Sequence, residues 1–215
     1  ITCLFAVTPI VVIGCGAVAD GSYSELSITS VTRIHGFHHS GFQELAQWTC
    51  AYEVWNALTA CIIPHYRTKE FLGHHIVTAL LAKLSQQYGP AFYGIFFFGL
   101  ASISTLPLSL VDIFRYGPKE LAEQWPTINT ICRVSFAILF LLIRGVIWPI
   151  MSFIFWWDAI QNMIHGEDDN SPPSWWLGIL LISNTFLGTL QMIWGVKIWK
   201  GLSKVLFGST PKKSN

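Results

Sequence analysis

The sequence predicts an all-α membrane protein with about six transmembrane helices in a bundle, because its composition, segment lengths and aromatic placement agree. Of its 215 residues, 52% are hydrophobic and only 12% are charged, and the mean hydropathy is +0.49. A helix needs about 20 mostly apolar residues to cross roughly 30 Å of bilayer hydrocarbon. Several such stretches lie between short polar breaks. Tryptophans cluster near segment ends, as at 156–157 and 175–176, where aromatic rings favour the head-group region.

Six apolar segments are expected to form the spans, and one of them has two interpretations. The stretch 127–165 is almost continuously apolar and contains Pro149. It predicts either one kinked span followed by an interfacial helix, or two spans. The favoured single crossing gives spans near residues 2–19, 44–64, 71–88, 90–113, 127–152 and 175–199.

The distribution of positive charge favours the single crossing, because short cytoplasmic loops carry an excess of lysine and arginine. With six spans, one side of the membrane receives most of the loop cations, namely Arg67, Lys69, Arg115, Lys119 and the tail lysines. The other side receives mainly Arg33 and the acidic segment 166–169. We therefore expect both termini in the cytoplasm. Two crossings would instead move the loop cations to the side opposite the tail.

One membrane domain is predicted, since no repeat, low-complexity tract or soluble domain is evident. The chain divides into a first transmembrane helix with the start of a loop (1–29), a transmembrane domain (30–200) and a basic cytoplasmic tail (201–215). A formal net charge of +1 excludes a strongly basic nucleic-acid-binding protein. The five cysteines lack metal-ligand spacing, and no cofactor motif is evident.

Two polar connections between the predicted spans have features that predict local structure. Residues 20–43 could carry structure of their own at the membrane surface. The adjacent His38 and His39 lack i,i+4 helical spacing and a nearby cysteine or carboxylate motif, so a solvated loop is favoured over a metal site. The segment 166–173 predicts a turn before the last span, with two prolines at the helix start.

A polar interior is predicted from helical spacing in the second and third segments. Tyr52, Asn56 and Thr59 fall on one face of the second segment, and His74 and Thr78 share a face of the third. His75 lies next to that stripe. A neutral histidine there could take a proton from a hydroxyl or amine substrate, which makes the histidine pair the catalytic candidates. The alternative is that these side chains hydrogen-bond between helices and stabilise packing without a substrate.

Charged residues inside spans are the other candidates, because each costs roughly 2.5–3.5 kcal/mol at the bilayer centre. Glu53 is expected to pair with Lys83 at similar depth, with a proton relay or a lipid-amine site as the alternative. Arg144 is placed nearer the head groups, where it could bind phosphate or a helix-end carbonyl. Asp112 and Arg115 are expected to form a surface pair.

Five motifs occur in the order and spacing of TLC-domain proteins, the ceramide synthases and their relatives. They are R-I-H-G-F-H (33–38), A-Y-E-V-W-N (51–56), F-L-G-H-H-I-V-T-A-L-L (71–81), S-T-L-P-L (104–108) and F-L-L-I-R-G-V-I-W-P (140–149). The sequence resembles that family over about residues 30–200. The resemblance implies a six-helix bundle enclosing a lipid-sized cavity.

Within the family, ceramide synthases join an acyl chain from acyl-CoA to a sphingoid amine and carry a histidine pair that matches His74 and His75. They also carry an H-D motif and a further aspartate, whereas the matching stretch 100–108 has no histidine or acid. The sequence is more similar to the non-synthase branch, which is associated with membrane lipid composition, sensing and transport. That branch usually has acids where Asn56 and Ala101 stand here.

Three functions follow as expectations. The first is a lipid-handling protein that binds, senses or modifies a membrane lipid in its cavity. The second is a non-catalytic subunit of a larger photosynthetic or respiratory membrane complex. The third is a ceramide-synthase-like acyltransferase. The ending K-K-S-N is similar to a dilysine retrieval signal if Asn215 is the natural terminus, which favours the endoplasmic reticulum over a plastid or mitochondrial membrane.

Overall fold

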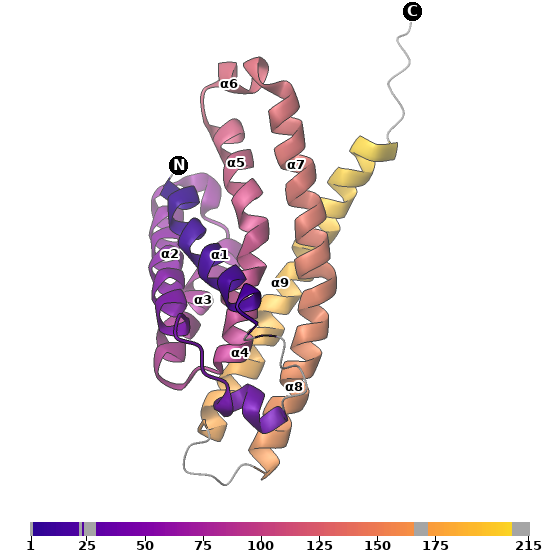
Figure 1. Cartoon of the computed structure of the whole chain (residues 1–215). Coiled ribbons are helices and arrows are strands. Elements are labelled where there is room, and N and C mark those ends of the chain that lie inside the picture. Colours follow the sequence, from indigo (N-terminus) through magenta and orange to yellow (C-terminus); the bar gives the residue numbers. More distant parts are fainter. Residues whose placement is uncertain (1, 22, 24–28, 166–171, 208–215) are drawn as a thin grey trace, which may run out of the picture.

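The computed structural model describes residues 2–21, 23, 29–165 and 172–207, which form helices and connections without a strand. Helices run back and forth along one bundle in six successive passes (Figure 1). The first three passes are α1 (Thr2–Ala19), α2 (Phe42–Ile62) and α3 (Lys69–Tyr88), with short helices η1 (Thr32–Gly36) and η2 (Pro64–Tyr66) between them.

The last three passes are longer, and two of them change helix type along their length. The fourth pass consists of α4 (Ala91–Gly94), η3 (Ile95–Gly99), η4 (Leu100–Ser104) and α5 (Thr105–Tyr116). Helix α6 (Lys119–Gln124) then leads to α7 (Pro126–Phe140), η5 (Leu141–Ile147), α8 (Trp148–His165) and finally α9 (Ser174–Phe207).

The predicted all-α membrane fold is confirmed. Three helices of the described chain are long and apolar enough to cross a membrane: Ala91–Tyr116, Pro126–His165 and Ser174–Lys204. Helix α1 is apolar but shorter. Large apolar side chains lie on the outer surface, with Phe5 74% and Phe153 73% exposed, as expected for a lipid-facing exterior. Six transmembrane spans remain a prediction, because α2 and α3 carry the polar interior residues and are less apolar.

The ambiguous stretch 127–165 belongs to one continuous helix of 40 residues. At 1.5 Å per residue it is about 60 Å long, which is enough for one crossing with an extension beyond the bilayer. The described residues contain neither a reversal nor a separate interfacial helix here. Pro149 cannot donate a hydrogen bond to the carbonyl of Gly145, and the widened π-helical turns of η5 end just before this proline. The continuous helix excludes two antiparallel spans within residues 127–165, while a single crossing remains a prediction.

The ends of the bundle agree with the predicted distribution of charge. The start of α1, helix α6 and the end of α9 lie at the same end of the molecule (Figure 1). At the opposite end, Pro172 and Pro173 lead directly into α9, as predicted. The acidic residues 166–169 and the tail lysines lie outside the described residues. Which end faces the cytoplasm remains a prediction.

The connection between α1 and α2 carries structure of its own, as expected. Arg33 of η1 donates from Nε to Asp158 Oδ2 of α8 at 2.5 Å and from a terminal nitrogen to Oδ1 at 2.8 Å. Tyr93 of α4 donates its hydroxyl to the same carboxylate, which is fully buried. This hydrogen bonding with Asp158 is the main reason that the pKa of Arg33 is raised above its ordinary value. The network anchors η1 against α4 and α8.

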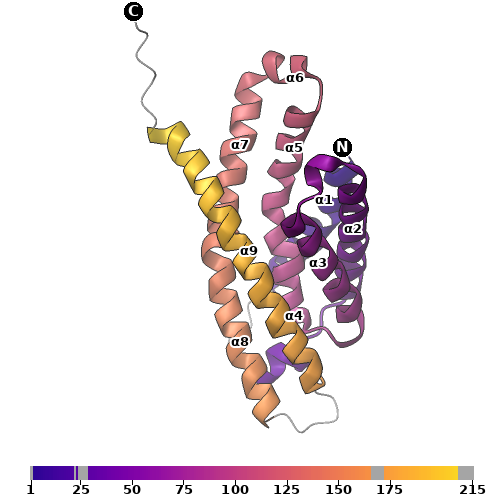
Figure 2. The same ribbon diagram turned by 180° about the vertical axis from the view of Figure 1, so that it is seen from behind.

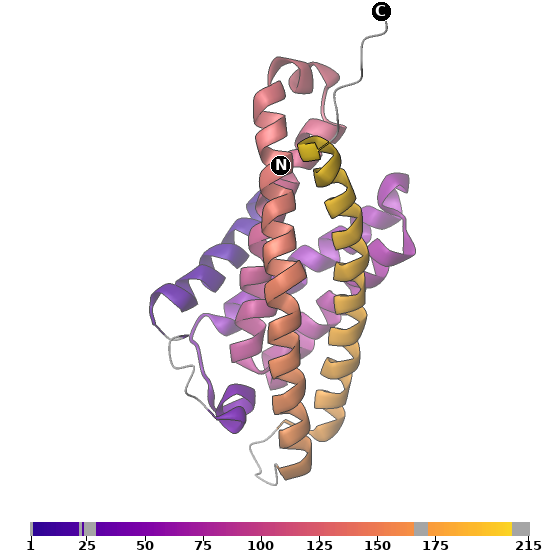
Figure 3. The same ribbon diagram turned by 90° about the vertical axis from the view of Figure 1, so that its right-hand side faces the viewer.

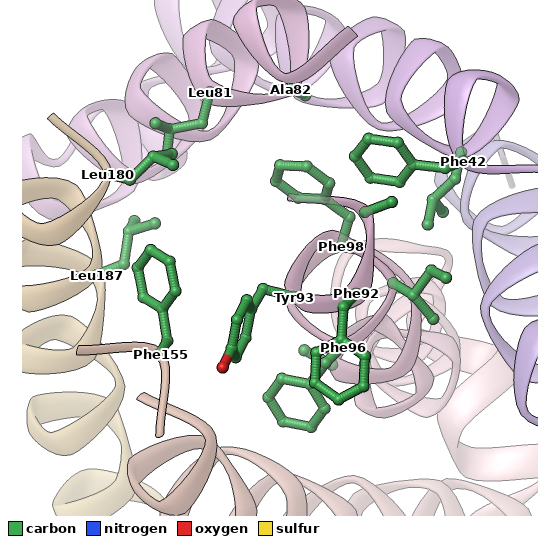
Figure 4. Packing of buried hydrophobic residues seen from close by; sticks show 14 of the residues in the cluster. Phe42, Leu81, Ala82, Phe92, Tyr93, Phe96, Phe98, Phe155, Leu180 and Leu187 are labelled. Carbon is green, nitrogen blue, oxygen red and sulfur yellow. The ribbon is translucent and has the colours of Figure 1, made fainter. Parts of the chain in front are cut away.

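Helices α8 and α9 lie side by side (Figures 2 and 3), and α9 contacts α3, while Phe155 of α8 lies against Tyr93 of α4 with ring centroids 4.8 Å apart. Figure 4 shows Leu180 and Leu187 of α9 next to Phe155 of α8, with Tyr93 of α4 facing them. The same four side chains line a narrow cavity in this part of the interior.

Helix α1 approaches the fourth pass so closely that only glycines fit. A Cβ atom added to Gly14 would lie 2.7 Å from the Cα atom of Gly99. We expect Gly14→Ala to lower the free energy of unfolding by about 1–3 kcal/mol, because backbone must shift to admit the methyl group. Thermal unfolding in detergent measures the effect. Gly16→Ala on the same helix is the control, since its added Cβ would meet no described atom within 4 Å apart from its chain neighbours and its own helix backbone. Equal melting temperatures for the two variants would contradict the close-packing argument.

Candidate functional site in the bundle interior

Glu53 of α2 and His75 of α3 contact each other inside the bundle. The carboxylate Oε2 lies within hydrogen-bonding distance of the imidazole Nδ1, and each side chain is only 9% exposed. The two helices form an antiparallel hairpin around η2, which brings together residues that are 22 positions apart. A carboxylate that orients an imidazole is a common arrangement for acid–base chemistry.

The predicted ion pair between Glu53 and Lys83 is wrong. Lys83 lies on the exposed face of α3, while Glu53 contacts His75 instead. Lys83 is eight residues further along the helix than His75, which corresponds to about 12 Å along the axis. The hairpin register, which sequence spacing left undetermined, therefore places the lysine at a different depth.

His74 faces the interior from the next position of α3. Its ring centroid lies 5.0 Å from that of His75 and 5.3 Å from that of Trp194 on α9. The Nδ1 atom of His74 is buried and has no hydrogen-bond partner among the described residues. Thr78 lies one turn away and donates its hydroxyl to the carbonyl of His74 at 2.8 Å. His74 thus presents a ring nitrogen that a ligand could engage.

Arg144 lies near the middle of the 40-residue helix. The helix continues unbroken to His165, and the position of Arg144 near the head groups remains a prediction. Its Nε donates to Ser104 Oγ at 3.0 Å, and a terminal nitrogen donates to Thr105 Oγ1 at 3.3 Å. The hydrogen bonds go to hydroxyls at the junction of η4 and α5, and the predicted helix-end carbonyl is not the acceptor. The guanidinium has five N–H donors, so others remain for a ligand.

Two interior cavities meet at these residues. A narrow cavity of about 80 Å³ extends toward the aromatic side chains of α4, η3 and α8, and a wide one of about 450 Å³ extends toward the far end of α5. Four polar residues line both cavities and define their junction: Glu53, His74, Ser102 and Arg144.

All seven residues predicted from the sequence line one or both cavities. They are Tyr52, Glu53, Asn56, His74, His75, Thr78 and Arg144. Asn56 donates from Nδ2 to the carbonyl of Tyr52 at 2.9 Å and accepts from the Cys3 thiol at 3.8 Å. The structure therefore brings these residues to one interior, while their catalytic or binding roles remain predictions.

Asp112 and Arg115 do not form the predicted surface ion pair within the described chain. Both line the wide cavity instead, together with Lys197 of α9. The three-residue spacing put both on one side of α5, but packing against neighbouring helices turns that side toward a cavity. These charged residues give the wide cavity a polar end.

A third space is an open groove of about 590 Å³ between α8 and α9. Its walls are mostly apolar side chains, including Phe153, Trp156 and Met192, and Arg144 and Trp148 lie at its inner edge. Trp148 Nε1 and Ser152 Oγ are buried there without a hydrogen-bond partner in the part of the chain that the structure describes. Sequence analysis missed this groove, although the tryptophans and Ser152 in an apolar run were its signal.

These features define a helical membrane protein with a polar centre inside an apolar bundle. Comparison with protein families matches residues 2–200 to the TLC domain, which includes the first helix. The chain belongs to the TLC domain family, as its motifs predicted. No curated protein matches the chain, and no solved structure matches it either.

Proposed function

We propose that this protein binds a membrane lipid with an anionic head group. The head group lies at the junction of the cavities. The observation that carries the proposal is the position of Arg144, which lines the narrow cavity, the wide cavity and the open groove. A buried cation that three spaces share is placed to bind an anionic group arriving from the bilayer.

The groove between α8 and α9 suits the acyl chain of that lipid. Its lining is largely apolar, and each buried methylene of a chain contributes about 0.8 kcal/mol. At its inner edge, Trp148 and Ser152 have buried polar atoms without partners among the described residues, so head-group oxygens could accept their hydrogen bonds. A lipid would then enter sideways from the bilayer with its head group leading.

The charges of the wide cavity agree with an anionic ligand. Histidines aside, its lining has three cations, Arg115, Arg144 and Lys197, against two acids, Glu53 and Asp112. The volume of about 450 Å³ also lies within the range of about 300–1,000 Å³ that is usual for small-molecule sites. An anionic head group would balance the excess positive charge.

Filling the groove tests the proposal. Gly188 of α9 lines the groove, and a Cβ added there would have only ordinary contact with Trp148 Nε1, at 3.7 Å. We expect Gly188→Leu to reduce bound lipid about tenfold, because its side chain displaces a few methylenes of the acyl chain. Native mass spectrometry after extraction in mild detergent measures the bound lipid.

The matched control is Gly178→Leu on the same helix, where an added Cβ meets no described atom within 4 Å apart from its chain neighbours and its own helix backbone. Full lipid occupancy in Gly188→Leu, or an equal loss in Gly178→Leu, would contradict binding in the groove. Wild-type protein that migrates without lipid in a large complex would support the structural-subunit alternative.

Acid–base chemistry on the bound lipid is a second candidate, and the contact between Glu53 and His75 favours it. We expect membranes that contain the wild-type protein to differ in lipid composition from membranes that contain His75→Gln. Glutamine keeps the side chain polar but lacks the basic ring nitrogen that acid–base chemistry needs. Lys83→Gln, on the exposed face of the same helix, is the control and should match the wild type. Identical lipid profiles for all three proteins would argue against a reaction.

A further inference from the structure

Three side chains of types that can ligate metals meet at the edge of the wide cavity. The carboxylate of Glu53 and the imidazoles of His74 and His75 have ligand atoms that all lie within 4.8 Å of one another. They come from two helices, so no spacing within a single segment reveals the set. The His74 Nδ1 atom is buried without a hydrogen-bond partner in the described chain, which leaves a free donor or acceptor beside the other two groups.

We propose that Glu53, His74 and His75 bind a divalent transition-metal ion, for which zinc is the best match. Two imidazoles and one carboxylate form a ligand set that binds zinc and leaves a fourth position for an exogenous ligand. Magnesium and calcium favour oxygen ligands and water, so a set with two imidazole nitrogens suits them poorly. This inference goes beyond lipid binding and does not depend on it.

The geometry requires only small side-chain movements. Zinc holds nitrogen and oxygen ligands at about 2.0–2.1 Å, so ligand atoms of a tetrahedral site lie about 3.3 Å apart. Glu53 and His75 are already closer than this, and rotation of either side chain would open the space for an ion. Phe71 lies against His75 with ring centroids 4.1 Å apart, and Trp194 lies against His74. These aromatic contacts hold the imidazoles near the junction.

The fourth position faces the cavities, because Glu53 and His74 line both of them. A divalent ion with one carboxylate ligand leaves one positive charge, and Arg144 at the same junction adds another. Uncompensated charge is costly in the low-dielectric interior of a membrane protein. The fourth ligand is therefore an anion, either hydroxide or the anionic head group of a lipid.

Metal analysis of the purified protein in mild detergent tests the site. Purified protein is depleted with a chelator, incubated with Zn²⁺, freed of excess ion and assayed for zinc. About one ion per chain is expected for wild-type protein. His74→Ala should bind at least about 100-fold more weakly, since even loss of an outer-shell partner of a metal ligand costs about 10–100-fold.

The matched control is His65→Ala. His65 lines the same wide cavity but lies outside the three-residue cluster, so this variant should retain the wild-type zinc content. His74→Cys restores a zinc ligand and should recover binding, which separates ligand loss from misfolding. Incubation of wild-type protein with Co²⁺ should give the visible absorption of a tetrahedral site, and this measurement needs no variant.

Monodisperse wild-type protein that takes up neither Zn²⁺ nor Co²⁺ would overturn the proposal. Equal zinc contents of wild type and His74→Ala would overturn it as well. The lipid measurement remains independent, because Gly188→Leu should lose lipid yet keep its zinc, with hydroxide as the fourth ligand.

Discussion

Replacing Asp158 by alanine is expected to destabilise the folded protein by about 1.5–3 kcal/mol, because it removes a fully buried carboxylate that accepts hydrogen bonds from a partly exposed guanidinium. Arg33 donates two hydrogen bonds to this carboxylate, and Tyr93 donates a third. The variant leaves a guanidinium and a hydroxyl without that acceptor at the interface of η1, α4 and α8. Chemical or thermal unfolding in detergent measures the loss.

A double variant separates the ion pair from general packing damage. Arg33→Met combined with Asp158→Leu removes both charges together, so it should cost clearly less than Asp158→Ala alone. Lys83→Met serves as a surface control and should change stability by less than about 0.5 kcal/mol, because Lys83 is exposed. If Asp158→Ala is as stable as Lys83→Met, the network does not anchor η1.

Arg144→Met is expected to reduce the amount of bound lipid by about 10- to 100-fold. Hydrogen bonds to a charged group contribute about 1.5–3 kcal/mol each, and one power of ten in affinity corresponds to about 1.4 kcal/mol. Methionine keeps most of the apolar volume but removes the cation that all three spaces share. Native mass spectrometry of the extracted protein, with identification of the released lipid, measures this effect.

Arg133→Met is the matched control, since Arg133 is an exposed residue of the same long helix and bonds only locally, to Asn129 Oδ1 at 2.9 Å. It should retain its lipid. Unchanged lipid content in Arg144→Met, or retention of neutral lipid alone in both variants, would show that the buried guanidinium does not select the ligand.

Helical spacing predicted the cavity-lining residues well because it depends only on the 3.6-residue period. Tyr52 and Asn56 lie four apart on α2, and both reach the wide cavity as expected. His74 and Thr78 likewise line the narrow cavity from one side of α3. A polar group in an apolar helix is costly against lipid, so its preference for the interior could be read without the fold.

Depth and partner choice could not be predicted in the same way. The pairing of Glu53 with His75 depends on the register of the α2–α3 hairpin, which η2 and its neighbours set. The position of Arg144 near the middle of its helix depends on the helix continuing past Pro149 to His165 without a break. Both features depend on where helices end and how they pack. An error of several residues in a predicted helix end shifts a side chain along the axis by a full helical turn or more.

The Arg33–Asp158 pair shows the same limit over a longer distance. Its partners are 125 positions apart and lie in a loop helix and a long apolar helix. An aspartate within that apolar helix was a visible signal of a buried partner, but nothing local identified which cation it was. The contact between Gly14 and Gly99 is similar. Nothing in the local sequence around either glycine indicates that the backbone of the other lies against it.

By itself, the sequence determined the helical membrane class, the TLC family and the set of polar residues that face inward. Hydropathy and helical period decide these features through local transfer free energies, which each segment carries alone. Only the tertiary structure decided that Glu53, His74 and His75 meet, that Arg144 lies between three cavities, and that Asp158 anchors η1. Such contacts join separate helices, and their geometry exists only after the bundle has packed.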